Sequence, residues 1–219
     1  MKNHISTLLI NPWIIDFAAY NLWAEPLGLL YIASILKKAG ARINYINCLA
    51  SVRETDPRPK KNGCSKYIRR VIQKPECLSF IKRNYAVYGI DEEEFISRLR
   101  AAEKPDAVLV TSIMTYWYPG VFKVIKLVKD FYGDKVPVIL GGIYSKLCPD
   151  HAKNRSAADF VYTDENPAKL LRLIEQISCK RFKYIPSIET FSDYPHPLHE
   201  LQKGTDLPDY PIALVPDHR

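Results

Sequence analysis

The residues of greatest chemical interest in this 219-residue chain stand where short apolar runs end. Runs such as TLLIN at 7–11 and VPVIL at 136–140 are typical of strands buried on both faces of an α/β sheet. The carboxyl ends of parallel strands face one crevice, where ligands bind. Five such ends carry small, polar or glycine residues, so we expect a ligand site built from Asn11-Pro12, Asn47-Cys48, Ser112, Gly141-Gly142 and Thr163-Asp164-Glu165.

The pair Gly141-Gly142 is the most suggestive of these strand ends. Glycine lets bare backbone come close to a ligand, and the pair directly follows a buried strand. The alternative is that the two glycines only make a tight turn. Long aromatic loops after two other strands, at 12–26 and 112–120, favour the ligand-binding interpretation.

These residues do not form a known catalytic motif. The GxSxG elbow, the GxGxxG fingerprint and the Walker A loop are absent, and Ser112 has no histidine near it in sequence. Asp150 and His151 come closest to an acid–base or metal pair, but a solvated loop is the favoured interpretation for both. His196 and His199 have a zinc-compatible spacing, but the prolines around them oppose the helix that it would require.

The cysteines and the apolar segments limit the class of protein. No two of the five cysteines lie two or three residues apart, which argues against a zinc ribbon, a CxxC redox site and a CxxxCxxC cluster loop. No apolar run approaches the roughly 18 residues of a membrane span. The first residues lead into a strand without a secretory signal, so we expect a cytoplasmic protein.

The charge is basic but spread out. The net charge is +7 and the isoelectric point is near 9.1, with many of the basic residues between Arg53 and Arg83. A solvated connecting region explains this segment. The alternative, contact with nucleic acid or an anionic surface, has no recognition motif to support it.

The order of the expected elements predicts the fold. Helices with apolar faces alternate with apolar strands, which is typical of a doubly wound, Rossmann-like or flavodoxin-like sheet. We therefore predict an α/β fold with a mostly parallel five-stranded sheet and helices on both faces. The expected strands are 7–11, 42–47, 107–111, 136–140 and 159–162, and the expected helices are 26–40, 91–102, 119–132 and 166–177.

Two segments depart from this alternation. The basic insertion at 48–90 follows the second strand, and Tyr67–Gln73 and Glu76–Arg83 are candidates for short helices within it. An α/β domain is expected over 1–180. A proline-rich extended arm is expected over 181–219, with one more strand at Pro211–Val215.

Five stretches together resemble a known family. The chain resembles the N-terminal domain of cobalamin-dependent radical S-adenosylmethionine enzymes, and the final stretch YPIALVP at 210–216 resembles the segment that enters the barrel of that family. The stretches that carry the resemblance are LLINP at 8–12, PLGLLYIASILKKAG at 26–40, PDAVLVTSIMTYWYPG at 105–120, PVILGGIYSKLCPDHA at 137–152 and ADFVYTDEN at 158–166.

The resemblance implies a Rossmann-like domain that binds cobalamin over the carboxyl ends of the strands. It implies that aromatic residues of 13–23 and 116–118 cover the ring and that the site is lined by Ser112, Thr115, Gly141, Gly142 and Tyr144. The sequence departs from the family in two ways. It lacks the DxHxxG motif, so no histidine is expected below the cobalt, and Thr163–Asn166 replaces a glycine turn.

The family also has a CxxxCxxC loop that holds a 4Fe–4S cluster, and this chain has none. The resemblance therefore implies a module truncated before the barrel and not catalytic alone, with the cluster and S-adenosylmethionine found only in the full-length family. Cobalamin and a separate radical S-adenosylmethionine domain or subunit are the expected partners. Two alternatives remain: a degenerate interaction domain without cofactor, and a flavodoxin-like nucleotide binder.

Overall fold

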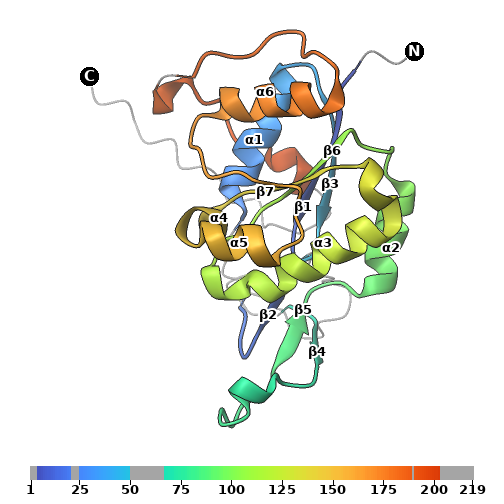
Figure 1. The fold of residues 1–219 in the computed structure, drawn as a ribbon, viewed down its shortest axis with the longest axis vertical. Coiled ribbons are helices and arrows are strands. Elements are labelled where there is room, and N and C mark those ends of the chain that lie inside the picture. Colours follow the sequence, from blue (N-terminus) through green and yellow to red (C-terminus); the bar gives the residue numbers. More distant parts are fainter. Residues whose placement is uncertain (1–3, 21–24, 50–66, 189, 203–219) are drawn as a thin grey trace.

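The computed structural model describes residues 4–20, 25–49, 67–188 and 190–202, and its centre is a five-stranded parallel sheet (Figure 1). In sheet order β3-β1-β6-β7-β8, the main strands run 2-1-3-4-5, the flavodoxin-like arrangement. The predicted fold class is confirmed. The strands are β1 Ser6–Asn11, β3 Arg42–Asn47, β6 Ala107–Val110, β7 Val138–Leu140 and β8 Phe160–Val161.

Helices cover both faces of the sheet, and the side chains of each strand alternate between them. Leu9, Leu109 and Ile139 pack in one cluster with α1 and α6. Their neighbours along the strands, such as Leu8 and Val108, pack in a second cluster with α2, α3 and α5. The helices are α1 Leu27–Lys38, α2 Glu92–Ala101, α3 Tyr118–Tyr132, α4 Ile143–Leu147, α5 Pro149–Arg155 and α6 Pro167–Ser178.

The helix boundaries follow local capping chemistry. Asp91 accepts a hydrogen bond from the backbone N–H of Glu94 at 2.7 Å and so begins α2. Asn166 accepts one from Ala168 at 2.9 Å, and Pro167 occupies the first position of α6. These caps place the start of α6 directly after β8, at the carboxyl edge of the sheet.

A second, antiparallel sheet extends the molecule beyond the carboxyl ends of the main strands, in the order β2-β5-β4 (Figure 1, lower end). It consists of β2 Ile14–Asp16, β4 Arg69–Val71 and β5 Ala86–Tyr88. The prediction of a helix at Tyr67–Gln73 is wrong, because pairing with β5 decides the conformation of so short a segment. Of the second candidate helix only a 3₁₀ turn forms, η2 Glu76–Leu78.

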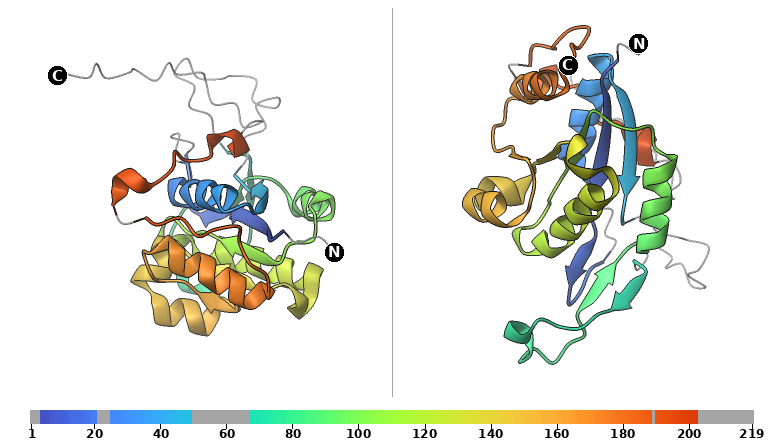
Figure 2. Two further views of the ribbon diagram at one scale, coloured as in Figure 1. Left: turned by 90° about the horizontal axis from the view of Figure 1, so that it is seen from above. Right: turned by 45° about the vertical axis from the view of Figure 1, so that its right-hand side comes forward.

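The arm after α6 lies on the cluster formed by α1 and α6. Phe182 is buried there, and Tyr194 and Leu198 pack against the same cluster. The backbone N–H of Leu198 donates to the carbonyl of Leu30 at 3.2 Å, which ties the arm to α1 (Figure 2). The strand predicted at 211–215 lies outside the described residues. Within those residues, every helix is too short or too polar to cross a lipid bilayer.

Candidate functional site

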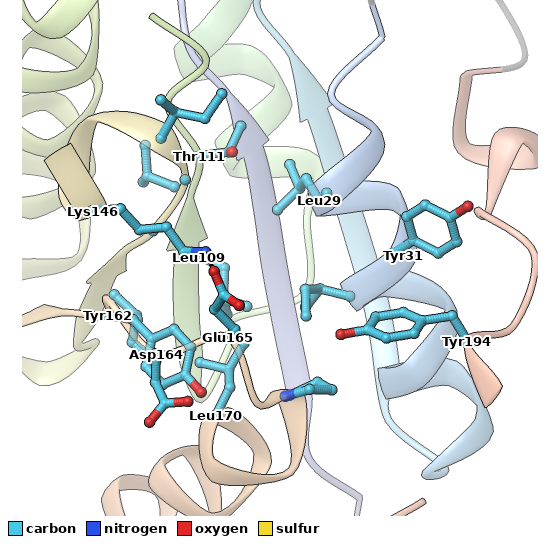
Figure 3. A pocket seen from close by; sticks show the side chains of 18 residues that line it. Leu29, Tyr31, Leu109, Thr111, Lys146, Tyr162, Asp164, Glu165, Leu170 and Tyr194 are labelled. Atoms are coloured by element: carbon cyan, nitrogen blue, oxygen red, sulfur yellow. Dashed lines mark hydrogen bonds and ion pairs between the residues drawn. The ribbon is translucent and has the colours of Figure 1, made fainter. Parts of the chain in front are cut away.

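A cavity opens at the carboxyl edge of the sheet, between its α1/α6 face and the starts of those two helices (Figure 3). Its volume is about 420 Å³, which lies in the roughly 300–1,000 Å³ range of small-molecule sites. The walls are mostly apolar, and polar groups lie at the mouth. Its lining residues include Gly28, Leu29, Tyr31, Ile32, Thr111, Gly141, Gly142, Lys146, Tyr162, Asp164, Glu165, Pro167, Leu170 and Tyr194.

The two adjacent positions after β7 are glycine for different physical reasons. Gly142 has φ +93°, and a Cβ there would overlap the backbone of Ser112. Gly141 has no such conformation, and a Cβ added to it would meet no atom within 4 Å beyond its chain neighbours. The fold therefore explains Gly142, whereas Gly141 leaves open space beside the cavity. Gly28, which also lines the cavity and lies in the first turn of α1, leaves the same open space.

Ser112 fixes the start of α4 through hydrogen bonds to the glycine turn and to the first residues of the helix. Its hydroxyl donates to the carbonyl of Gly141 at 3.1 Å and accepts from the backbone N–H of Tyr144 at 3.2 Å. Its carbonyl accepts from Ile143 at 2.8 Å. Ser112 is buried and is not part of the cavity lining, so it fixes the glycine turn rather than facing the cavity.

Ion pairs and shifted pKa values mark the mouth of the cavity. Lys146 pairs with Glu165 at 2.6 Å, and Lys169 pairs with Asp164 at 2.6 Å. The hydrogen bond from Lys169, together with the backbone N–H of Asn166, holds the pKa of the Asp164 carboxyl below its usual value. Burial, and secondarily the charge of Asp164, raises the pKa of Tyr162 to about 12.

The other half of the carboxyl edge, at the ends of β1 and β3, is filled by the chain itself. The Asn11 amide donates to the side-chain oxygen of Asn47 at 2.9 Å. Trp13 is fully buried, and its indole N–H donates to the carbonyl of Ile90 at 2.7 Å. A Cβ on Gly89 would overlap the carbonyl of Cys48, so even the glycine of this half is enclosed by backbone.

An aromatic cluster occupies the opposite side of the β7 end from the cavity. Tyr144 is 1% exposed, and its hydroxyl lies 2.6 Å from Nδ1 of His151. The Tyr118 ring lies against both rings. Burial, with smaller effects of Cys148 and Tyr118, raises the pKa of Tyr144 to about 12. The loop favoured for Asp150 and His151 is wrong, because both residues lie in the helix α5, although both are exposed.

The structure divides the ten predicted site residues between these environments. Gly141, Gly142, Asp164 and Glu165 line the cavity. The remaining six lie outside its lining: Asn11, Pro12, Ser112 and Tyr144 are buried, Thr115 begins the 3₁₀ turn η3 Thr115–Trp117, and Thr163 is exposed. Their assignment as cofactor contacts stays a prediction.

Several lining residues had no part in the sequence-based site. Gly28 could have been found, because a glycine in the first turn of a helix after a long loop is unfavourable without a reason of its own. Lys146 could also have been considered, because it follows Gly142 by four residues, in the helix that begins at the end of β7. Tyr194 could not, because it reaches the cavity from the arm, and no signal in the sequence links the arm to the strand ends.

Metal-ligating groups do not gather in the part of the chain that the structure describes. No three His, Cys, Asp or Glu side chains there could hold one ion, and no described histidine lines the cavity. The described cysteines, Cys48, Cys77, Cys148 and Cys179, are free thiols.

The comparisons with known proteins support the fold. No family model and no curated protein sequence matches this chain. The chain is similar in structure to the radical S-adenosylmethionine methyltransferase TsrM from Kitasatospora setae, solved with cobalamin and a [4Fe-4S] cluster bound. The TM-score is 0.50 and the identity 14%, over 82% of this chain and 27% of that one. At that identity the similarity shows a related fold alone.

A second solved structure is more distant. Rubredoxin oxygen:oxidoreductase from Desulfovibrio gigas aligns with a TM-score of 0.32 and 10% identity, over 93% of this chain and 34% of that one. That score is too low to support an argument. The chain thus spans about a quarter to a third of the length of these two proteins.

Proposed function

We propose that this domain binds cobalamin at the carboxyl edge of its sheet, with the cavity under α1 and α6 receiving part of the cofactor. The observation that carries the proposal is Gly141. Neither backbone conformation nor crowding explains a glycine there, whereas close approach of a ligand would. The fold it shares with the cobalamin-bound methyltransferase supports the same interpretation.

The chemistry of the lining fits cobalamin better than a nucleotide phosphate. The lining provides apolar walls, an amide backbone at Gly141, and the carboxylates of Asp164 and Glu165. Carboxylates accept hydrogen bonds from the amide groups at the periphery of a corrin ring. A terminal phosphate, as in a flavin mononucleotide, would instead meet two carboxylates that already hold the nearby lysines.

When bound, cobalamin would supply methyl transfer or a related radical step in the intact enzyme. The residues of this chain would bind and orient it. Gly28 and Gly141 leave room for it, Tyr162 and Tyr194 bound it on opposite sides, and Lys146 and Glu165 stand at the mouth (Figure 3). The 4Fe–4S cluster and S-adenosylmethionine would belong to a separate radical S-adenosylmethionine domain or subunit. We also propose the cytoplasm as the compartment of this protein.

The direct test is retention of hydroxocobalamin. The protein is mixed with hydroxocobalamin, passed over a desalting column, and its visible spectrum is recorded. We expect one cobalamin per chain, and lack of retention at micromolar concentrations contradicts the proposal.

A matched pair of variants places the site. Gly141→Leu adds a side chain beside the cavity and should abolish retention. Ala101→Leu adds a leucine at the exposed end of α2, away from the cavity, and should retain cobalamin fully. Equal retention by both variants contradicts binding at this cavity. Melting temperatures of the two variants confirm that each is folded.

One observation favours a second candidate, an interaction domain that no longer binds cofactor. Asp164 and Glu165, where the family has a glycine turn, are both engaged in ion pairs with lysines of this chain. If hydroxocobalamin is not retained, a partner captured independently of cobalamin supports this alternative. Retention of flavin with its yellow absorbance would instead support the nucleotide binder.

A further inference from the structure

Among the residues that the structure describes, the antiparallel sheet β2-β5-β4 ends in an open edge. β4 pairs with β5 on one side only, and it is the outermost described strand of this sheet. Both Figure 1 and the right-hand view of Figure 2 show this sheet projecting from the body of the molecule. The unpaired N–H and C=O groups of an edge strand are a template for another strand.

The register identifies the backbone groups that face outward. The N–H of Ile72 donates to Tyr85 at 2.9 Å, and the N–H of Gly89 donates to Ile68 at 2.8 Å. Backbone bonding alternates along an antiparallel strand, so Ile68, Arg70 and Ile72 bond toward β5. The backbone groups of Arg69 and Val71 therefore point away from β5, to the open edge.

The side chains of this edge are exposed, and its surroundings are basic. Val71 is 59% exposed, and Arg69 is also exposed. Across 67–85 the chain has five basic residues and one acidic residue. Two of the five are engaged within the protein: Arg70 donates to the carbonyls of Gly89 and Ile90, and Lys74 lies over the Phe17 ring. The other three, Arg69, Lys82 and Arg83, form no ion pair with a described residue.

We propose that the open edge of β4 docks an acidic, extended segment of a partner protein as an additional strand. A polypeptide backbone satisfies both the outward donors and the outward acceptors of Arg69 and Val71. A nucleic acid phosphate can only accept, so it would leave the carbonyls unpaired. A second copy of this chain would bring the arginines of two β4 strands together, which like-charge repulsion opposes.

The side-chain pattern of β4 sets the pattern of the partner segment. Arg69 and Val71 project to one face of the sheet, and Arg70 projects to the other. The segment should therefore present an acidic residue beside Arg69 and an apolar residue beside Val71. The simplest segment with this pattern carries glutamate and valine two residues apart, as in a repeat of Glu-Thr-Val-Thr.

A labelled peptide tests the recognition. Fluorescence anisotropy is measured with the full chain and a fluorescein-labelled peptide of repeated Glu-Thr-Val-Thr, with a peptide of repeated Lys-Thr-Val-Thr as the matched control. We expect the acidic peptide to bind about tenfold more tightly than the basic one or better. Equal binding of the two peptides, or no saturable binding of the acidic one, overturns the proposal.

A single substitution tests strand addition. Val71→Pro removes an outward N–H and leaves the bonds to β5 intact, and proline is tolerated on edge strands. It should weaken the acidic peptide about tenfold, whereas Val71→Thr, which keeps the N–H, should change the affinity less than about twofold. An unchanged affinity for Val71→Pro overturns the proposal, provided that its melting temperature shows a folded protein.

Three further measurements keep the test decisive. If Val71→Pro does not fold, Arg69→Glu should reverse the preference from the acidic to the basic peptide, and an unreversed preference overturns the proposal. Displacement of the acidic peptide by single-stranded oligothymidylate would also overturn it, in favour of nucleic acid. The peptide affinity should be the same with and without hydroxocobalamin, so failure here is distinguishable from failure of cobalamin binding.

Discussion

The two halves of the carboxyl edge of the parallel sheet differ, because the chain fills one half and leaves the other open. At the ends of β1 and β3 the edge is filled by Trp13, by the Asn11–Asn47 pair and by the antiparallel sheet that follows. At the ends of β6, β7 and β8 it is open, and a cavity of about 420 Å³ lies beside Gly141. The same kind of strand end therefore serves packing in one half and leaves space in the other.

The difference shows how to separate residues of the fold from residues of the site. Gly89 in the filled half, and Gly120 of α3 where it packs on Trp13, have no room for a Cβ because a backbone carbonyl occupies its place. Gly141 has room for a Cβ, but no side chain fills this space. A glycine with unused space at the edge of a parallel sheet is thus better evidence for a ligand than a glycine that the backbone requires.

The largest effect is expected from the filled half. Trp13→Ala removes a fully buried ring and its hydrogen bond to the carbonyl of Ile90. It also removes the packing of this ring on Phe95, whose ring centroid lies 4.9 Å from that of Trp13. We expect the free energy of unfolding to fall by about 3–5 kcal/mol, the usual cost of truncating a buried aromatic residue. Urea denaturation measures this, and a loss below about 1 kcal/mol would show that this half is less firmly packed than the structure indicates.

The adjacent glycines test the comparison within one turn. Gly142→Ala places a Cβ at φ +93° against the backbone of Ser112, and we expect it to destabilise the protein by about 1–3 kcal/mol. Gly141→Ala meets open space and should change stability by less than about 1 kcal/mol.

Among the folded variants, Gly141→Ala should lose more cobalamin retention than Gly142→Ala. This order is the reverse of the order expected for their losses of stability. Gly141→Ala reduces the space beside the cavity while it leaves the turn intact, so it should weaken binding at nearly wild-type stability. Equal stability losses at Gly141 and Gly142 would contradict the distinction between the two glycines.

Much of the fold follows from the sequence, because buried parallel strands and amphipathic helices have strong patterns. The five main strands and the helices between them agree with the prediction, whereas the strand order 2-1-3-4-5 comes from the structure, because no local pattern encodes which strands are neighbours. The antiparallel sheet was missed because β2 and β4 have three residues each, and their conformation depends on pairing with β5 across the chain.

The site was predictable only to the level of the sheet edge. The rule that ligands bind at the carboxyl ends of parallel strands identifies this edge. It does not say toward which face of the sheet each residue after a strand is directed. Ser112 and Tyr144 turn toward the α3 side, whereas Gly141 and Glu165 border the cavity on the α1 side. That choice depends on the turn geometry of single residues, which the apolar pattern of the sequence does not contain.

A smaller effect is expected at alkaline pH, where two tyrosines can be compared, one in the aromatic cluster and one at the cavity. Burial raises the pKa of Tyr144 in the aromatic cluster and of Tyr162 at the cavity to about 12, from an ordinary value of 10.0. The folded state then holds the proton more tightly, so this stability is complete below pH 10 and is lost as the pH rises toward 12.

Denaturation across this pH window, with Tyr144→Phe and Tyr162→Phe, measures the two contributions. Each substitution should make the loss of stability with pH less steep. Tyrosinate absorbance gives the pKa values directly. An ordinary pKa for Tyr162 beside a raised one for Tyr144 would show that water enters the cavity and would sharpen the contrast between the two environments.

The smallest effect is expected at the mouth of the cavity. Lys146 and Glu165 form a 2.6 Å ion pair, but their side chains are 40% and 86% exposed. Water and salt screen such a pair, so Lys146→Ala should change the free energy of unfolding by less than about 1 kcal/mol. Lys126→Ala, which breaks the exposed pair with Asp130 on α3, is the matched control and should change it as little. If the open half is built for a ligand, the two variants should differ in cobalamin affinity although they agree in stability. A Lys146 variant that loses several kcal/mol would instead make the mouth part of the folded core, and the contrast between the halves would fail there.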